Sequence, residues 1–265
     1  MANDRLDSLS LVFMALGGAV LLFIVAPLLG MFLECPLSEL LKTASDGEAS
    51  RSIGLTLWAS LAATLLCSVA AIPFSYFLAR RDFALKGVIM GIINLPIVIP
   101  HSAAGIALLG ILSRNTLMGK AANQVGFSFV GGVPGIMAAM AFVSIPFLMN
   151  AAHDGFLAVP QRLENAARTL GASPFRVFFT ISLPLAWRPI LSGLVLMWAR
   201  GLSEFGAVII IAYHPMITPV LIFERFNDFG LKFARPVAVL FIIICLLTFV
   251  VLRLLARGKA RVESV

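Results

Sequence analysis

Charged side chains are scarce in this 265-residue sequence. Only 12% of the residues are charged and 60% are hydrophobic, with a mean hydropathy of +1.00. A soluble domain carries about 25% charged residues, so a water-soluble fold is excluded and a bilayer is the expected surrounding. The net charge of +7 does not indicate nucleic-acid binding, because the basic residues lie in short segments that flank apolar runs. No nucleic-acid partner is expected.

The sequence also lacks the motifs of an enzyme. No Gly-x-x-x-x-Gly-Lys-Ser/Thr motif occurs, and the nearest match, Gly119-Lys120-Ala121, has Ala where a hydroxyl group would bind Mg²⁺. There is no His/Glu metal cluster and no nucleophile motif with its partners. The three cysteines are odd in number and lack metal-ligand spacing. A chain without catalytic residues, cofactor or metal is therefore expected.

What the sequence does contain is a series of apolar runs, each long enough to cross a bilayer, which takes roughly 20 helical residues. The first is too long for a signal-peptide core and is interpreted as a retained span, and the last, after Pro236, is expected to face lipid. Of the 20 Lys and Arg residues, 12 lie on the side of the termini and seven on the other side. This asymmetry predicts a multi-pass protein of the cell membrane with both termini and the loop 158–188 in the cytoplasm. The six runs, which form a single domain over residues 1–265, are about 11–33, 53–79, 88–112, 134–157, 189–213 and 236–256.

The third run contains Asn94, Pro96, Pro100 and His101. Pro96 and Pro100 are four residues apart, so both leave free carbonyl groups on one helix face, and a bend bridged by Asn94 is expected there. Two interpretations stay open, an ordinary kinked helix or a bend that lines a transport pathway. In the second, Pro96, Pro100 and Ser102 are pathway candidates. His101 is expected to be a structural polar residue and not a metal ligand.

The fifth run contains a charged pair, Arg200 and Glu204, one helical turn apart. A lone charge at the bilayer centre costs about 2.5–3.5 kcal/mol, so the two are expected to pair. Ala199, Ser203 and Ala207 predict a small-residue face for close helix contact. The pair either fixes the packing against a symmetry mate or borders the translocation route, which makes Arg200, Ser203 and Glu204 pathway candidates.

The longest mixed polar and apolar stretch is residues 160–184. Pro160 is placed to start a short helix, and Gly171 to end it in the left-handed conformation. Ser173 and Pro174 are typical of the N-cap and first position of a second helix. A helix–corner–helix element that enters a groove of another protein is predicted. Its apolar stripe is Leu163, Ala166, Ala167 and Leu170.

This stretch resembles the EAA loop of ABC importer permeases, whose pattern is Glu-Ala-Ala, three residues, Gly, nine residues, Ile-x-Leu-Pro. The matching residues are Asn165-Ala-Ala, Gly171 and Ile181-Ser-Leu-Pro184. The Glu position of the motif holds Asn165, so a charged contact made there by other permeases is expected to be weaker or shifted to Glu164, about 100° around the helix. Pro146-Phe147, the run 163–174 and the run 200–207 are similar to the molybdate/tungstate/sulfate branch, and residues 212–225 to archaeal molybdate/tungstate permeases.

The resemblance implies a type I ABC importer permease fold with six transmembrane helices per subunit, working as a homodimer. Each subunit would dock on a separate cytoplasmic ABC ATPase, and an extracytoplasmic protein would deliver molybdate or tungstate. A sulfate permease is the alternative within this class, and an ion-coupled carrier using Glu204 is the rival from another class. The implied ATPase-docking residues of the coupling loop 158–184 are Leu163, Glu164, Asn165, Ala166, Ala167, Arg168, Leu170, Gly171, Ala172, Ser173 and Pro174.

Overall fold

All regular structure in the described part of the chain is helical. The computed structural model describes residues 8–258, and no strand occurs among them. The predicted all-α fold is confirmed. In chain order the elements are α1 (Ser8–Leu33), α2 (Leu37–Ser45), α3 (Gly47–Arg80), α4 (Lys86–Val98), α5 (His101–Leu112), α6 (Leu117–Gln124), α7 (Val133–Ala158), α8 (Gln161–Thr169), α9 (Pro174–Val177), the π-helical η1 (Phe178–Ser182), α10 (Leu183–Leu185), α11 (Trp187–Leu202), α12 (Gly206–Ile211), α13 (Thr218–Phe229) and α14 (Leu231–Gly258).

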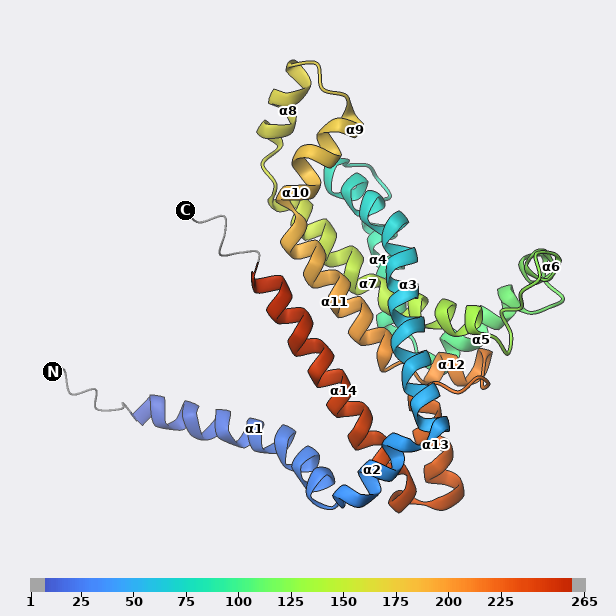
Figure 1. The fold of residues 1–265 in the computed structure, drawn as a ribbon. Coiled ribbons are helices and arrows are strands. Elements are labelled where there is room, and N and C mark those ends of the chain that lie inside the picture. The colour runs from blue at the N-terminus through green and yellow to red at the C-terminus, as the bar shows by residue number, and fades with distance from the viewer. Residues whose placement is uncertain (1–7, 259–265) are drawn as a thin grey trace.

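The centre of the molecule is formed by α3, α7 and α11, with α4 against α7 (Figure 1). Lipid offers little hydrophobic drive between helices, so close packing at small residues has to hold them together. A Cβ atom at Gly193 of α11 would lie 2.8 Å from the Cβ atom of Ala151 of α7. At Gly155 of α7, a Cβ atom would lie 2.7 Å from Cβ of Pro189. These glycines let α7 and α11 approach closely where the last turns of α7 meet the first turns of α11.

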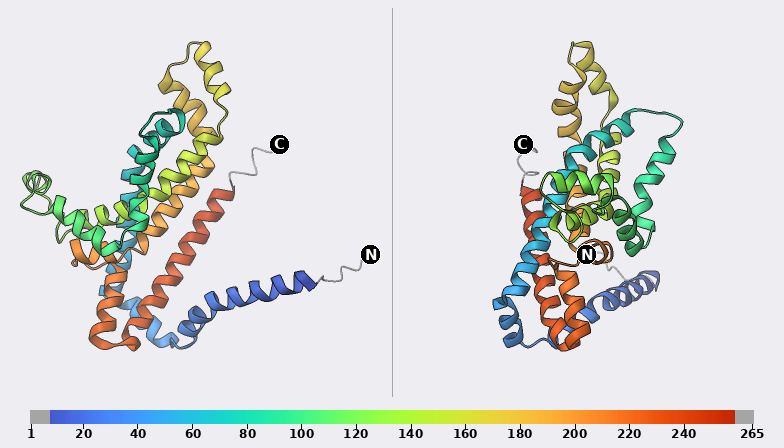
Figure 2. Two further views of the ribbon diagram at one scale, coloured as in Figure 1. Left: turned by 180° about the vertical axis from the view of Figure 1, so that it is seen from behind. Right: turned by 90° about the vertical axis from the view of Figure 1, so that its right-hand side faces the viewer.

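The outer helices α1 and α14 are packed differently. α1 is exposed along nearly its whole length and leans away from the other helices (Figure 2). α14 begins at Leu231, before Pro236, and its first half packs on α2 and α13. Val237 and Phe241 are buried there, whereas Leu246 is exposed. The expectation that the last run faces lipid is therefore wrong for the first half of this helix, because α2 and α13 cover it and Phe241 packs on Ile53 of α3 and Trp198 of α11.

Two of the apolar runs are broken helices. The third run turns by 115° between α4 and α5, with the break at Ile99 and Pro100. The fifth run ends as a helix at Leu202 and resumes as α12 only at Gly206. The bend expected in the third run is present, whereas the break of the fifth run at residues 203–205 was not expected from the sequence. The bend lies at Pro100 and not at Pro96, because α4 continues helically through Pro96 to Val98.

Four helices in the described range are long and apolar enough to cross a membrane, namely α1, α3, α7 and α14. Two bent pairs also qualify if each is counted as one span, which raises the number to six. These pairs are α4 with α5, and the segment 174–185 with α11, which meet at 75°.

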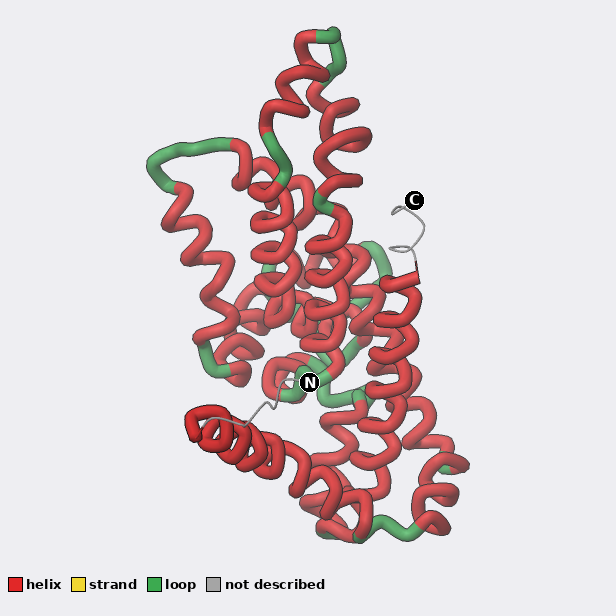
Figure 3. Tube along the Cα trace, turned by 90° about the vertical axis from the view of Figure 1, so that its left-hand side faces the viewer, coloured by secondary structure: helices red, strands yellow, loops and turns green. Residues whose placement is uncertain are grey.

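The two ends of the molecule carry different elements (Figure 3). One end holds α8 and α9 above the last turn of α3, and the opposite end holds α2 and α13. At the latter end Arg225 of α13 forms ion pairs with Asp46 and Glu48 at the start of α3. Arg235 of α14 pairs with Glu34 at 2.6 Å. These ion pairs connect α13 to the start of α3 and α14 to the segment between α1 and α2.

The contact between α5 and α12 can be tested at Gly105. A Cβ atom there would lie 2.8 Å from Cβ of Ile210 and 2.9 Å from the carbonyl oxygen of Ala207. Because the α12 backbone cannot yield, Gly105→Ala is expected to destabilise the protein by about 1–3 kcal/mol. Gly110→Ala on the same helix is the control, since nothing lies within 4 Å of its added Cβ atom. Equal thermal unfolding midpoints for the two variants in detergent would contradict the contact.

Candidate functional site

The loop between α7 and α9 folds as the predicted helix–corner–helix element. Gly171 has φ +87°, in the left-handed region. Its N–H donates to the carbonyl of Arg168, and the N–H of Ala172 donates to that of Ala167, both at 3.0 Å, which is a Schellman motif. Ser173 caps α9 by accepting from the N–H of Arg176 at 3.3 Å, and Pro174 is its first residue. Pro160 differs from the prediction by one position, because it is the extended N-cap of α8 and Gln161 begins the helix.

The element presents apolar side chains that nothing in the described chain covers. Leu163 is 43% exposed, Leu170 is 89% exposed and Phe175 is 73% exposed. Ala166 is also exposed and Ala167 is half-buried, so the predicted apolar stripe exists but faces away from the bundle. Exposed apolar side chains grouped in this way are typical of a protein contact. Of the other predicted docking residues, Asn165, Arg168, Gly171, Ser173 and Pro174 are exposed and Ala172 is half-buried.

Glu164 lies on the opposite side of α8 and is buried. Its Oε1 atom accepts from Arg80 Nη2 at 2.7 Å and from Arg80 Nε at 2.9 Å, with only 3% and 9% of the Glu164 and Arg80 side chains exposed. Ser182 Oγ donates to the same oxygen at 2.8 Å, and the Tyr76 hydroxyl donates to Oε2 at 3.2 Å. Of the two alternatives for the charged contact of the motif, a weaker contact or a shift to Glu164, the structure favours the first, because Glu164 is buried and accepts four hydrogen bonds from Arg80, Ser182 and Tyr76.

This cluster joins four segments at one carboxylate. Arg80 ends α3 and also donates to the carbonyl of Val159, the residue after α7, at 3.0 Å. Glu164 belongs to α8, and Ser182 ends η1. Tyr76 packs edge-on against Phe156 and Phe178 beneath the pair, at ring-centroid distances of 5.2 and 5.0 Å. The helix–corner–helix element is thereby fixed to α3, α7 and the segment that leads into α11.

The pKa of Glu164 reflects two opposed effects. Burial alone raises it, but hydrogen bonds from Arg80, Ser182 and Tyr76 outweigh burial, so the pKa lies below its ordinary value of 4.5. The carboxylate is consequently charged at neutral pH, and the ion pair is present.

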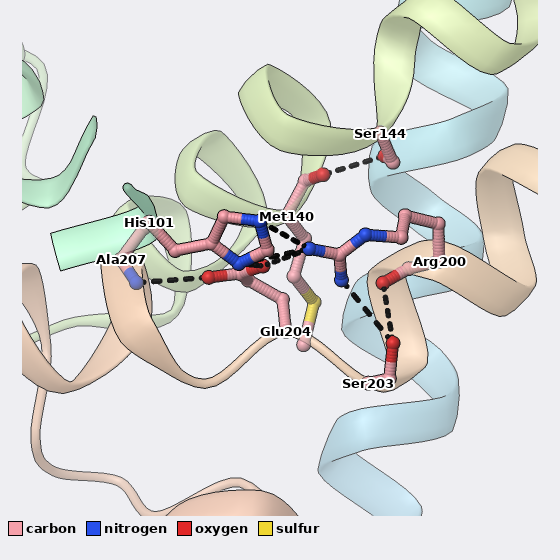
Figure 4. A network of polar contacts seen from close by, with 7 residues as sticks. All are labelled: His101, Met140, Ser144, Arg200, Ser203, Glu204 and Ala207. Atoms are coloured by element: carbon pink, nitrogen blue, oxygen red, sulfur yellow. Dashed lines mark hydrogen bonds and ion pairs between the residues drawn. The ribbon is translucent and has the colours of Figure 1, made fainter. Parts of the chain in front are cut away.

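A second polar cluster lies within the bundle, where the two helix breaks meet (Figure 4). Glu204, in the break after α11, is fully buried, and its Oε1 atom accepts from the N–H of Ala207 at 2.8 Å. Its Oε2 atom lies 3.1 Å from Arg200 Nη2 and 3.0 Å from His101 Nδ1. Arg200 Nη1 also donates to Ser203 Oγ at 3.2 Å. The predicted pair of Arg200 with Glu204 is confirmed.

The pair does not lie on one continuous helix, however. Because α11 ends at Leu202, the expected small-residue face of Ala199, Ser203 and Ala207 is wrong. His101 is the first residue of α5, and its contact with Glu204 joins the break at Pro100 to the break at Ser203. This agrees with a structural polar role for His101.

The remaining pathway candidates are distributed around these breaks. Pro96 is buried within α4, Pro100 is the N-cap of α5, and Ser102 and Ser203 are exposed. Asn94 does not bridge the carbonyl freed by Pro96. It donates to the carbonyl of Met90 at 2.8 Å and accepts from Asn150 of α7 at 2.6 Å.

Sequence reasoning missed the partners of Glu164. Arg80 is one of the 12 basic residues on the side of the termini, and no sequence motif marks Tyr76 or Ser182 as functional. The available signal was the isolation of Glu164, the single acidic residue in the loop 158–184, because a carboxylate next to an amphipathic apolar stripe requires a partner.

The comparison with known proteins agrees with this architecture. Residues 71–261 match the family described as binding-protein-dependent transport system inner membrane component. This chain belongs to that family. The resemblance to ABC importer permeases is thereby confirmed.

Two relatives of this family member cover nearly its full length. It is 43% identical to the molybdate/tungstate transport system permease protein WtpB of Pyrococcus abyssi, over 94% of this chain and 96% of the relative. It is 42% identical to the protein of the same name from Thermococcus kodakarensis, over 96% of this chain and 99% of the relative. Its fold is similar to the crystal structure of a bacterial ABC transporter involved in the import of the acidic polysaccharide alginate. That match has a TM-score of 0.72 at 17% identity and covers 96% of both chains.

The anchoring role of the buried pair can be tested with Arg80→Ala. This change leaves Glu164 buried without its cation, which costs about 3–5 kcal/mol, and the loop 158–184 is expected to detach locally. Trypsin should then cleave at Arg168 and Arg176 much faster than in the unchanged protein. Lys86→Ala is the control, because it breaks the exposed pair with Asp82, worth about 0–1 kcal/mol. Equal cleavage rates for both variants would count against the anchor.

A pH dependence follows from the lowered pKa of Glu164. The stabilisation by the ion pair is complete above the ordinary value of 4.5 and is lost as the pH falls through the lower pKa of the folded state. Hydrogen exchange in residues 158–184, corrected for intrinsic rates, is therefore expected to accelerate as the pH falls below 4.5. Glu164→Gln should remove this dependence, and a variant that retained it would assign the effect to another group.

Proposed function

We propose that this chain is the membrane subunit of an ATP-driven importer of molybdate and tungstate. It works as a homodimer, with each copy docked on a cytoplasmic ABC ATPase subunit and an extracytoplasmic binding protein delivering the anion. The substrate assignment is supported by relatives of nearly equal length, named as molybdate/tungstate permeases. The orientation, with the loop 158–184 and both termini in the cytoplasm, is supported by the excess of basic residues on that side.

The observation that carries the proposal is the combination of a rigid anchor and an uncovered face in the loop 158–184. The anchor is the buried pair of Arg80 with Glu164. The uncovered face includes Leu163 and Leu170. An element that is rigidly attached to the bundle and apolar on its free side is suited to receive force from a second protein. The sequence has no nucleotide-binding motif of its own, so that second protein is expected to hydrolyse the ATP.

Force applied to α8 has two routes into the membrane. One runs through Glu164 and Arg80 into α3, and the other through α9, η1 and α10 into α11. The joint formed by His101, Arg200 and Glu204 lies further along α11, where α5 and α12 branch off. Movement of α11 against α7 is therefore expected to shift α5 and α12 together.

The rival carrier mechanism is disfavoured by the surroundings of Glu204. Proton coupling requires a carboxylate that releases and rebinds its proton during the cycle. Glu204 is held by the Ala207 N–H and matched by Arg200. Protonating it would leave Arg200 uncompensated in the bundle.

The positive charge of Arg200, neutralised by Glu204, suits the passage of a dianion. A cluster with a net positive charge would retain the anion. Selectivity is therefore expected to reside in the binding protein.

Reconstitution into lipid vesicles tests the proposal. The chain is combined with an ABC ATPase and a molybdate-binding protein from the same organism, and uptake of radioactive molybdate and tungstate is measured with sulfate as competitor. Uptake is expected only with ATP and all three proteins, with little competition by sulfate. Uptake by the chain alone under a proton gradient would refute the proposal, and preferential sulfate uptake would refute its substrate.

The coupling role of the corner can be tested at Gly171. Gly171→Val is expected to strain the left-handed corner by at least about 1–2 kcal/mol and to lower uptake per ATP hydrolysed several-fold while membrane insertion stays normal. Gly171→Asn is the matched control, because Asn tolerates the left-handed region and should keep most of the coupling. Unchanged coupling in the Val variant would contradict a force-transmitting corner.

A further inference from the structure

The exposed charge of the loop 158–184 is of one sign. Its single acidic residue, Glu164, is buried and paired with Arg80. The remaining charged residues of the loop, Arg162, Arg168 and Arg176, are exposed, and Arg81 is exposed beside it. Asp82, next to Arg81 in the sequence, and Asp154, four residues before the loop, are exposed carboxylates that contact Lys86 and His153. The surface around the loop is therefore cationic, with no free carboxylate within the loop.

Part of this charge lines a cleft between α8 and the end of α3. The cleft has a volume of about 300 Å³ and opens to the surface. Arg80 and Glu164 both lie on its wall, and their charges compensate each other in the buried ion pair. Arg81 and Arg168 form no ion pair within the part of the chain that the structure describes. The lining residues that remain free to bind a ligand are Arg81, Arg168, Gln161 and Asn165.

We infer that this cleft receives a carboxylate side chain of the ATPase subunit, held between Arg81 and Arg168. This inference rests on the proposed function and adds the polarity of the contact, which is basic on this chain and acidic on its partner. Guanidinium groups suit the task because their forked N–H groups match both oxygens of a carboxylate. The amides of Gln161 and Asn165 add neutral donors that need no further counter-charge.

The residue at position 165 of the cleft is a neutral asparagine, which leaves the net positive charge of the cleft undiminished. A carboxylate at this position, as in the EAA pattern, would lie on the same wall as Arg168 and reduce the positive charge. With Asn165 there, the charge of Arg81 and Arg168 stays uncompensated. The position of the cleft favours the ATPase over a free anion, because α8 supplies both a wall of the cleft and the exposed apolar side chains of Leu163 and Leu170. A partner that covers those side chains reaches the cleft with its own side chains.

The test uses the chain in detergent and its ATPase, with the dissociation constant measured at several salt concentrations. Arg168→Glu is expected to weaken ATPase binding roughly tenfold or more and to lower its salt dependence. Arg162→Glu is the matched control, because it makes the same charge change on the same helix but does not line the cleft. Its effect is expected to stay within about threefold, typical of a rim charge. Thermal unfolding verifies that both variants fold.

A second measurement identifies the partner group. Arg168→Lys and Arg162→Lys complexes are treated with a carbodiimide, which joins a lysine amine to a carboxylate it contacts, and the products are mapped by mass spectrometry. Lys at position 168 is expected to couple to an Asp or Glu of the ATPase, and changing that residue to Arg should restore binding to Arg168→Glu.

The outcomes separate this inference from the proposed function. If the unchanged chain binds no ATPase, the proposed function itself fails. If it binds and both Glu variants weaken binding equally, or position 168 yields no cross-link to the ATPase, the cleft contact is refuted. Binding of molybdate or of phosphatidylglycerol vesicles that is lost in Arg168→Glu, with ATPase binding unchanged, would also overturn it.

Discussion

The buried ion pair of Arg80 with Glu164 is the constraint on which the geometry of the loop 158–184 depends. Without it, α8 would keep its contacts with α9 and η1 but would lose its only ion pair with α3 in the described part of the chain. The pair is held by two guanidinium contacts, a serine and a tyrosine hydroxyl, which satisfies the carboxylate well enough to offset its loss of water. Because Arg80 ends a 34-residue helix, the orientation of α8 is tied to the whole length of α3.

The same requirement for polar partners organises the interior of the bundle. Breaking a helix at membrane depth exposes backbone groups and demands compensation inside the protein. The breaks at Pro100 and Ser203 satisfy this demand jointly, because His101 from one and Glu204 from the other are in contact, and Glu204 also accepts from the N–H of Ala207. Gly206 lets the two backbones meet, since a Cβ atom there would lie 2.8 Å from Cβ of His101.

Local features of the fold were readable from the sequence wherever one residue type is sterically required. Gly171, Ser173 and Pro174 were predicted correctly because left-handed and capping positions accept few residues. The direction of the turn at Pro100 and the end of α11 at Leu202 were not predicted. The runs on both sides of each break are mainly apolar, so hydropathy does not show in which direction a helix turns or where it stops. The partner of Glu164 was also beyond reach, since Arg80 lies 84 positions away and only the folded helices bring the two together.

In the loop 158–184, neighbouring residues of α8 serve two purposes: Glu164 anchors the helix and Asn165 contributes to its exposed surface. Adjacent residues of an α-helix point about 100° apart, so Glu164 is buried against Arg80 of α3 while Asn165 is exposed, although both line the cleft. Exchanging the chemistry of these two positions would leave Arg80 without its counter-ion and place a carboxylate on the outer surface. The sequence order Glu164-Asn165 therefore determines both how the element is held and which charge it presents. The side chains that anchor the element, Arg80 and Glu164, therefore differ from those that stay unpaired on its surface in the described chain, Arg81 and Arg168, even though all four line one cleft.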